Sequence, residues 1–408
     1  MDRVKAMNHQ RLHLLYFVTE DWFFCSHFIE RAVAAQRAGY EVSVLTRVRE
    51  HGDRIRAEGL SLIPIEIQRK GLNPFRELST ILQLILIYRR ERPHLVHHFA
   101  LKPIIYGTLA SWLASIEHCV NAPVGMGFVF SSSSRLARLI RPMVRLTLRA
   151  LLNPSGSRVV FENADDLAEA VASGLVRSQA AVLIRGAGVD IVRFRPYPEP
   201  DGVPKVVLVA RMLWEKGVGE FVEAARRLRA RKVAARFLLV GAPDAESPAA
   251  IPVSQLQAWA RENVVEWWGQ RSDVAEILAD SHIVCLPSYY REGLPKALLE
   301  ALAAGRPIVA TDAPGCREAV RHGDNGFLVP NRDPEALAEA LARLIQDPLL
   351  RQRMGACGRR RAETEFASSL VCEATLALYR ELLAGKKHAN LSAAADGDMF
   401  VDRSRPHE

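Results

Sequence analysis

Two glutamates eight residues apart make the stretch YYREGLPKALLEALAAG, residues 289–305, a place where chemistry can be done. Glu300 interrupts ALLEALAA, a helical pattern that is apolar on nearly every side and is therefore expected to be buried. A buried carboxylate is unfavourable unless something pairs with it. Glu292 precedes the start of the same helix, where free backbone amides and the helix dipole favour an anion. We therefore expect a ligand that brings an anionic group to the helix start and hydroxyl donors to Glu300.

A purely structural alternative is an ion pair between Glu300 and Lys296, four residues earlier. With the lysine on the N-terminal side, such a pair contributes only a few tenths of a kcal/mol. It hardly explains a charge on a buried helix.

Two cations complete the pattern in VVLVARMLWEKGVGEF, residues 206–221. Arg211 ends a strand-like run, and Lys216 precedes a glycine and a helical pattern. Two cations beside free helix amides suit a diphosphate, whose departure would develop negative charge there. One fixed hydrogen-bond donor to such developing charge stabilises the transition state by roughly 3–4 kcal/mol.

Strand-like runs alternate with helical patterns along the whole chain, which predicts parallel sheets covered by helices on both faces. We expect an N-terminal domain over 1–190, a proline-rich linker over 191–204 and a second domain over 205–365. A last helix over 366–385 is expected to return to the first domain, ahead of a disordered tail over 386–408. Ligands of such sheets bind beyond the carboxyl ends of the strands. The site is therefore expected in the cleft between the domains.

The composition favours an ordinary globular protein and argues against a zinc site and a membrane-spanning helix. Hydrophobic residues make up 49% of the chain and charged residues 25%, as in ordinary globular proteins. The six scattered cysteines form no C-x-x-C pair, which favours the reducing cytosol and argues against zinc. The longest apolar run, ILQLILIY (81–88), is too short to span a bilayer. Residues 1–190 hold 24 Lys and Arg against 17 Asp and Glu, so an anionic partner is expected on that half.

The segments ARMLWEKG and PSYYREGLPKALLEALAAGRPIVATDAPGCREAV resemble glycosyltransferase family 4. VHHFALKPIIYG (96–107), VVFENADD (159–166) and IRGAGVDIVRFRP (184–196) resemble its bacterial capsule, O-antigen and N-glycan assembly branch. The resemblance implies the GT-B fold, two Rossmann-like domains facing across a cleft. It also implies a retaining transfer of a sugar, a hexose or N-acetylhexosamine, from a nucleotide sugar, most often UDP-linked. The acceptor implied is a glycan on a polyprenyl diphosphate at the cytoplasmic face of the membrane.

The resemblance also implies roles for single residues. Arg211 and Lys216 match the pair that holds the nucleotide diphosphate, and Glu292 matches the glutamate near the donor sugar. Glu300 matches the glutamate that accepts from the ribose hydroxyls. The remaining donor-side residues are the sugar and phosphate contacts Gly293 and Leu294 and the base-binding Gln270 and Arg271. The family needs no metal, so neither a metal nor another cofactor is expected.

The acceptor side is less defined, because the loop VNAPVGMGFVF (120–130) lacks the histidine that many family members carry. Candidates that follow strand-like segments are Asp21, His27, His98 and Lys102. Either histidine could instead be a satisfied histidine at a strand end. Lys102 could meet an acceptor phosphate or be an ordinary surface lysine.

The segment RLARLIRPMVRLTLRALL (135–152) has the composition of a helix that lies on a membrane surface. Five arginines fall on one helical stripe and are candidates for contact with an anionic leaflet: Arg135, Arg138, Arg141, Arg145 and Arg149. A domain helix with a solvated basic face is the alternative. We expect a cytoplasmic protein peripherally associated with the membrane.

Three other functions remain open from the sequence. A glycogen-synthase-like enzyme would act on a soluble glucan. An inactive scaffold of a membrane assembly complex would fit the missing loop histidine but not the four charged residues of the donor side. A nucleic-acid binder could use the basic stripe, but no binding motif accompanies it, so no nucleic-acid partner is expected.

Overall fold

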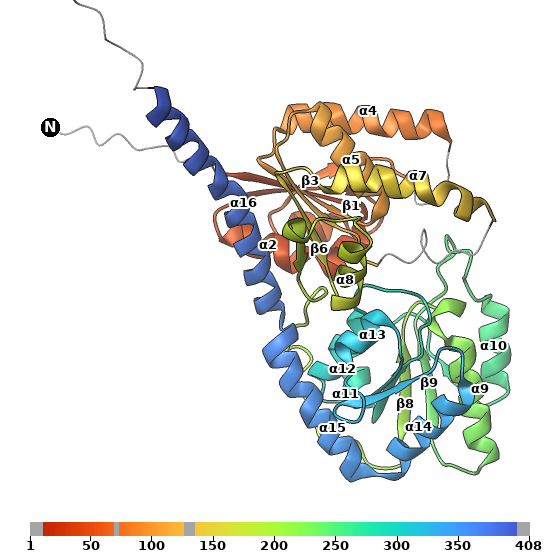
Figure 1. The fold of residues 1–408 in the computed structure, drawn as a ribbon. Helices are drawn as coiled ribbons and strands as arrows, with labels where there is room; N and C mark the ends of the chain where they lie inside the picture. The colour runs from red at the N-terminus through yellow and green to blue at the C-terminus, as the bar shows by residue number, and fades with distance from the viewer. Residues whose placement is uncertain (1–10, 69–72, 126–134, 398–408) are drawn as a thin grey trace, which may run out of the picture.

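Two parallel sheets, each covered by helices on both faces, form the two halves of the molecule (Figure 1). The computed structural model describes residues 11–68, 73–125 and 135–397, except the side chains of 135–142 and 385–397. Every strand pairing in both sheets is parallel, and the strands are almost fully buried, as expected for sheets covered on both sides. The predicted α/β fold class is therefore confirmed.

The N-terminal sheet has seven strands in the order β3-β2-β1-β4-β5-β6-β7. In chain order they are β1 (His13–Glu20), β2 (Glu41–Arg47), β3 (Ser61–Pro64), β4 (Leu95–Phe99), β5 (His118–Ala122), β6 (Ser157–Phe161) and β7 (Ala181–Leu183). One face packs against α1 (Asp21–His27), α2 (Ile29–Arg37) and α3 (Gly52–Ala57). The other face packs against α4 (Pro74–Glu91), α5 (Leu101–Leu113), α7 (Arg135–Leu152) and α8 (Ala164–Ala172).

The C-terminal sheet has six strands in the order β10-β9-β8-β11-β12-β13. They are β8 (Lys205–Val209), β9 (Arg236–Val240), β10 (Glu266–Trp267), β11 (Ile283–Leu286), β12 (Ile308–Thr311) and β13 (Gly326–Val329). The helices α9 (Val218–Ala230), α10 (Val253–Arg261) and α14 (Pro334–Gln346) cover one face. The helices α11 (Val274–Ala279), α12 (Lys296–Ala303) and α13 (Pro314–Ala319) cover the other.

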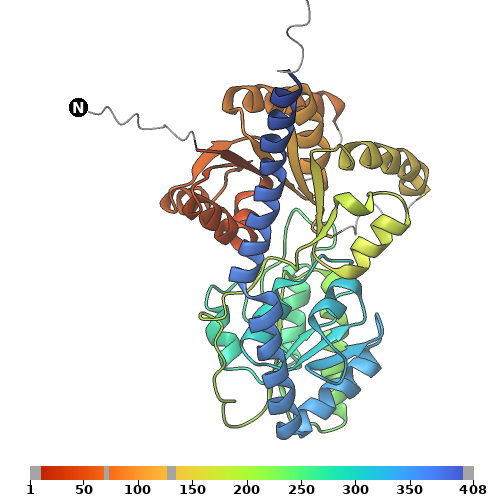
Figure 2. The same ribbon diagram turned by 60° about the vertical axis from the view of Figure 1, so that its left-hand side comes forward.

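The chain returns to the N-terminal half at its end (Figure 2). After α15 (Pro348–Arg361) and a π-helical turn (Ala362–Phe366), the helix α16 (Ser368–Gly397) packs beside α2. Its Tyr379 is fully buried and donates a hydrogen bond of 2.9 Å to the hydroxyl of Tyr16 on β1. The helix continues past residue 385, where we expected it to end, because the alanine-rich segment that follows favours helix.

Candidate active site

A cleft of about 670 Å³ lies between the two sheets and is lined from both. Its N-terminal wall comprises the turn from β1 into α1 and the segment after β2. Its C-terminal wall comprises the segments that follow β8, β9 and β10. Both walls therefore lie at the carboxyl ends of parallel strands, where ligands of such sheets bind. The structure brings three of the predicted donor-side residues to this cleft: Arg211, Gln270 and Arg271.

Arg211 lies two residues after the end of β8, and its side chain is 40% exposed. Its Nη1 donates to Oδ2 of Asp244 at 2.6 Å. Its guanidinium also lies 5.8 Å from the centre of the Trp22 ring, which belongs to the N-terminal half. A cation held at the cleft by a carboxylate and an indole face is well placed to change partners when an anionic ligand arrives.

Lys216 is placed by the short helix η2 (Trp214–Lys216) and by Gly217 after it. Gly217 has φ +75°, and a Cβ there would lie 2.0 Å from the carbonyl oxygen of Pro287. Only glycine allows this close approach. The approach brings Lys216 to Glu292, with which it forms an ion pair, while Oγ of Ser288 donates to Glu292 at 2.7 Å. The segment that carries Lys216 and the segment that carries Glu292 are far apart in sequence, and this ion pair joins them.

Glu300 lies on α12, whose other faces are buried among leucines and alanines. Its side chain is 13% exposed, and its nearest cation is Lys296, with Nζ at 3.8 Å from Oε1. Lys296 itself donates to the carbonyl of Ser26 in the N-terminal half at 2.6 Å. Within the described residues nothing donates a hydrogen bond to Glu300, and burial raises the pKa of its carboxyl. The carboxylate retains free acceptor capacity on a helix that otherwise excludes charge.

The loop at Gly293 and Leu294 is held by the N-terminal half. The Leu294 amide donates to Oε2 of Glu162 at 3.1 Å, and Nδ2 of Asn163 donates to the Gly293 carbonyl at 2.8 Å. A Cβ on residue 293 would lie 2.0 Å from Glu162, so glycine is required for this contact. Arg291 extends the interface through an ion pair with Asp166, with Nε at 2.6 Å from Oδ1.

Glu162 is a functional candidate that the sequence analysis did not assign. Burial raises the pKa of its carboxyl to about 7, with Arg31 opposing that shift. The signal was present in VVFENADD, where an acid and an amide follow a buried strand. Only the fold shows that they contact the donor-side loop.

Gln270 and Arg271 follow β10 and lie beside the end of β9. The Gly241 amide donates to the carbonyl of Gly269 at 2.7 Å, which fixes the start of this segment. Arg271 pairs with Asp273 through Nε and Oδ1 at 2.8 Å, so its backbone rather than its side chain is free to face a ligand.

Asp21, by contrast, is used by its own domain. It lines the cleft, but its carboxylate accepts the backbone amides of Trp22 at 2.7 Å, Arg49 at 2.7 Å and His51 at 2.9 Å. It is fully buried and fixes the loop after β2 against the start of α1.

His98 does not line the cleft, and its acceptor-side role stays an untested prediction. It is fully buried beneath α4 and α5. Its Nε2 lies 3.0 Å from the Tyr88 hydroxyl and its Nδ1 lies 2.8 Å from Oδ1 of Asn121. Both ring nitrogens are satisfied within the core.

Lys102 donates to Oε1 of Glu77 at 2.8 Å and to the carbonyl of Gln68 at 2.7 Å. The structure therefore gives this lysine partners between α4 and α5, and it is not placed with the donor-side residues.

His27 remains next to the interface. It ends α1, beside the Ser26 carbonyl that Lys296 contacts. Its Nδ1 is buried and has no partner among the described residues. Burial, aided by Lys296, lowers the pKa of its imidazole to about 3, so the ring is neutral at physiological pH. A neutral ring at the interface keeps His27 as an acceptor-side candidate.

The basic helix predicted over 135–152 is α7. The side chains of Arg135, Arg138 and Arg141 lie outside the described residues, as does part of the 120–130 loop. Arg145 donates to the carbonyl of Ser173, and Arg149 is exposed. In the described part of the chain, no helix has both the length and the apolar character that crossing a membrane requires. Nor do the described residues include a group of three or more His, Cys, Asp or Glu side chains placed to hold a metal ion.

Comparison with known proteins relates each half of the chain to glycosyltransferases. Residues 13–153 match the family model described as Glycosyl transferase 4-like, and residues 203–347 match the model described as Glycosyl transferases group 1. The chain is 29% identical over 356 residues to the N,N'-diacetylbacillosaminyl-diphospho-undecaprenol alpha-1,3-N-acetylgalactosaminyltransferase of Campylobacter jejuni, covering 84% of this chain and 92% of that protein. It is 20% identical to the capsular polysaccharide biosynthesis glycosyltransferase CapM of Staphylococcus aureus, covering 77% and 84%.

Solved structures agree on the fold. HepE from Anabaena in complex with UDP-glucose matches with a TM-score of 0.73 at 17% identity, over 91% of this chain and 100% of that chain. At this identity the likeness concerns the architecture, and it confirms the predicted GT-B fold.

Proposed function

The chain belongs to the GT4-like, group 1 glycosyltransferases, and we propose that it moves a sugar from a UDP-sugar to a glycan on a polyprenyl diphosphate, with retention of configuration. The transfer serves assembly of a bacterial surface polysaccharide or glycan and uses no metal ion, as the family resemblance implies. Because a polyprenyl-linked acceptor resides in a bilayer, the enzyme works at the cytoplasmic face of that membrane.

The observation that carries the donor assignment is Glu300. Its carboxylate is largely buried, its pKa is raised, and the described residues supply it with no hydrogen-bond donor. A pair of vicinal hydroxyls, such as those of a ribose, would supply two donors to one carboxylate. Burying a charge with such donors is far more favourable than burying it alone.

Arg211 and Lys216 hold the diphosphate in this proposal. In the free protein each is paired with a carboxylate, Asp244 and Glu292 respectively. Binding of a diphosphate shifts both cations toward the phosphate oxygens, where they stabilise the negative charge that grows as the sugar departs. Glu292, still oriented by the Ser288 hydroxyl, is then available to accept from a hydroxyl of the donor sugar.

The acceptor assignment rests on the relative from Campylobacter jejuni, whose name specifies a diphospho-undecaprenol acceptor and N-acetylgalactosamine transfer. The match spans most of both proteins, including the N-terminal domain that would bind an acceptor. Asp21 lines that side of the cleft, and His27 ends the helix α1 that begins there. We propose that an acceptor glycan enters along this wall.

Thermal unfolding in the presence of nucleotides tests the donor assignment, because a ligand of the folded state raises the midpoint. We expect UDP and UDP-sugars to raise the midpoint more than GDP or ADP does. Glu300→Ala should reduce this response by weakening nucleotide binding roughly ten- to hundredfold, the range of one hydrogen bond to a charged group. Glu339→Ala, an exposed glutamate of α14, is the matched control and should respond like the wild type.

A wild-type midpoint that no nucleotide moves would contradict the proposed enzyme and favour an inactive scaffold. A response to ADP-glucose alone, with activity on a soluble glucan, would favour the glycogen-synthase-like alternative.

A further inference from the structure

Helix α4 presents a row of large apolar side chains to solvent. Phe75 is 83% exposed and Leu86 is 66% exposed, with Leu78 and Leu82 exposed between them. The spacing of three, four and four residues places all four on one face of the helix. The opposite face, with Leu84, Ile85 and Tyr88, is buried against the sheet. A helix of a globular protein normally exposes polar residues on its outer face, so this row calls for a partner.

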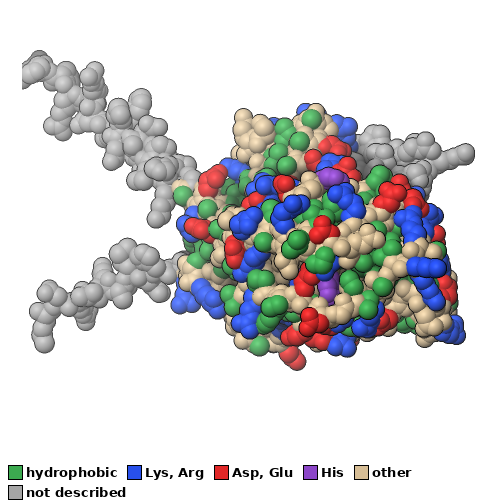
Figure 3. All heavy atoms as spheres, turned by 90° about the horizontal axis from the view of Figure 1, so that it is seen from below, with side chains coloured by type: hydrophobic (Ala, Val, Ile, Leu, Met, Phe, Trp, Pro, Cys, Tyr) green, Lys and Arg blue, Asp and Glu red, His purple; other side chains and the backbone are tan. Residues whose placement is uncertain are grey.

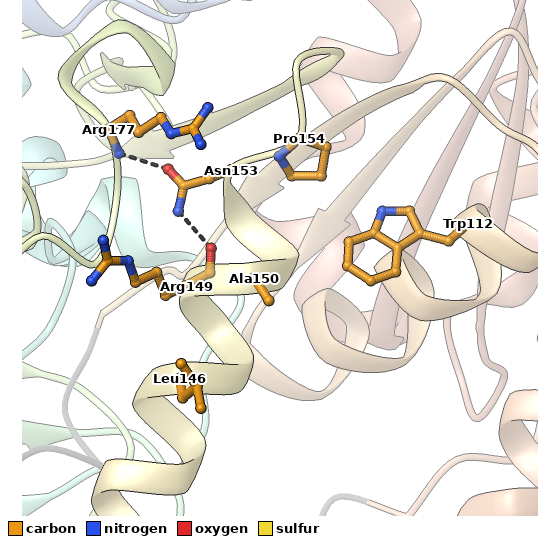
Figure 4. Close-up of a pocket in the computed structure, with 7 residues that line it drawn as sticks. All are labelled: Trp112, Leu146, Arg149, Ala150, Asn153, Pro154 and Arg177. Carbon is orange, nitrogen blue, oxygen red and sulfur yellow. Dashed lines mark hydrogen bonds between the residues drawn. The ribbon is translucent and has the colours of Figure 1, made fainter.

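The apolar row continues across α5 to α7. The C-terminal end of α4 is joined to that of α5 by Arg89, whose Nη2 donates to the Leu113 carbonyl at 2.9 Å. Trp112 and Leu113 are both exposed there. Beside them is a shallow hollow of about 480 Å³, lined by Trp112, Leu146 and Arg149, among others (Figure 4). The three helices lie side by side on one face of the N-terminal sheet (Figure 1).

The net charge of these three helices is strongly positive. Together they contain nine Lys and Arg residues and two acidic residues, Glu77 and Glu91. Both glutamates are paired, with Lys102 and Arg90 respectively. On the end of the molecule seen in Figure 3, cationic and anionic side chains are instead interspersed.

Two guanidinium groups flank the hollow. Those of Arg149 and Arg177 have no acidic partner among the described residues, and Asn153 lies between them through its bonds to their backbones. The amide of Asn153 fixes the backbone positions of both arginines, so their side chains lie at one side of the hollow, while the indole of Trp112 lies at the other (Figure 4). A hollow with cations at one side and an exposed indole at the other suits the boundary between lipid headgroups and acyl chains, where aromatic side chains are enriched.

We infer that the outer face of α4, α5 and α7 is the membrane-docking surface of this protein, and that its partner is an anionic lipid bilayer. The exposed row of α4 enters the boundary between headgroups and acyl chains, and the arginines contact lipid phosphates. This inference rests on the proposed function only in that a lipid-linked acceptor requires the enzyme to meet a bilayer. It assigns the apolar contact to α4, which the arginine stripe of α7 alone would not predict.

A bilayer fits these observations better than a protein partner does. The exposed row follows the outer face of one helix, as in helices that lie in a membrane interface. The excess cations require an extended anionic surface rather than a single complementary side chain. If a second copy of this chain docked through the same surface, the nine cations of one copy would face the nine of the other, and the two would repel.

Co-sedimentation of the full chain with vesicles tests the inference. Vesicles of phosphatidylglycerol and phosphatidylcholine should retain the wild type, and vesicles of phosphatidylcholine alone should retain less. The double variant Leu82→Ser/Leu86→Ser should lower the bound-to-free ratio about tenfold or more. Arg149→Gln should lower it roughly fivefold. The matched control is Val192→Ser/Leu349→Ser, two apolar residues outside this surface that are more exposed than Leu82 and Leu86, and it should bind like the wild type.

Equal retention of the α4 double variant and the wild type would overturn the inference. So would a wild type that ignores the vesicles but forms a dimer that Leu82→Ser/Leu86→Ser dissociates, because a second copy would then occupy the surface. The nucleotide-induced thermal shift, measured on the same preparations, separates this failure from a failure of the proposed function. The double variant should retain the wild-type shift with UDP.

Discussion

The two walls of the cleft treat their charged groups differently. On the C-terminal wall, Arg211 is 40% exposed with one carboxylate partner, and in the same domain, on α12, Glu300 receives no hydrogen bond from the described residues. On the N-terminal wall, the carboxylate of Asp21 accepts three backbone amides. Behind that wall, His98 and Lys102 both have hydrogen-bond partners within their own domain. One wall holds groups that can change partners, and the other holds groups that fix its backbone.

This difference matches what each wall would bind under the proposed function. A nucleotide diphosphate is small and highly charged, so it is recognised by a few under-partnered ions. A lipid-linked glycan is large and mostly neutral, so it needs a surface of fixed shape more than free charges. The following substitutions test whether the two walls differ in this way.

The largest effect is expected for Lys216→Ala. Loss of one cation at the developing diphosphate charge should lower kcat/KM by roughly a hundred- to a thousandfold, about 3–4 kcal/mol of transition-state stabilisation. Steady-state kinetics with a UDP-sugar measure the change, with Arg353→Ala on the exposed side of α15 as control. If Lys216→Ala had nearly wild-type kinetics, Lys216 would not act on the ligand, and the proposed difference between the two walls would be contradicted.

Glu162→Gln should change the pH dependence of stability. Because the folded-state pKa of about 7 lies above the ordinary glutamate value of 4.5, the folded state keeps a proton that the unfolded state has lost. Wild-type stability should therefore fall as pH rises from about 4.5 to about 7 and then level off. The part due to Glu162 is roughly 3 kcal/mol.

Urea unfolding of both proteins between these pH values measures that slope. The glutamine variant can still accept from Leu294 and should show a flatter profile. Parallel profiles for the two proteins would mean that Glu162 ionises normally at the interface.

His98→Leu should destabilise the protein without changing its catalysis. The variant leaves the Tyr88 hydroxyl and the Asn121 side chain with lost partners in the core, at a cost of about 1–3 kcal/mol for each group. Chemical denaturation gives the loss, and the KM values for donor and acceptor should stay unchanged at a temperature where the variant is folded. A selective rise in the acceptor KM would restore a functional role to this histidine.

The smallest effect is expected for Lys102→Met. The ion pair with Glu77 is partly exposed, and such pairs contribute about 1 kcal/mol or less. Neither stability nor the acceptor KM should change much. A tenfold rise in the acceptor KM would instead show that Lys102 leaves Glu77 to contact an acceptor phosphate.

The charged residues of the C-terminal domain could be predicted from the sequence because the residues that position them are close to them in the chain. A strand, a glycine with positive φ and a helix start fix where Lys216 must lie, and the fold class sets the edge at which these elements meet. The family assignment, the enzyme class and the GT-B fold inferred from these motifs are confirmed by the comparisons.

The N-terminal wall could not be predicted to the same depth, because partner choice there depends on distant residues. Nothing in the residues around His98 shows that Tyr88 and Asn121 will satisfy it. Glu162 stands more than a hundred residues from Leu294, whose amide it accepts. A buried histidine and a catalytic one look alike until their surroundings are known.

The return of the chain at α16 has a consequence for how this enzyme can be divided or shortened. Val189 bonds to both Phe366 and Ser368, so the two connections between the halves run side by side and are held together by backbone hydrogen bonds. A chain truncated after residue 365 would lose α16 from the N-terminal sheet, and the hydroxyl of Tyr16 would lose its tyrosine partner. Fusions and tags therefore belong beyond residue 397, and the halves are best exchanged between relatives with α16 kept alongside the first.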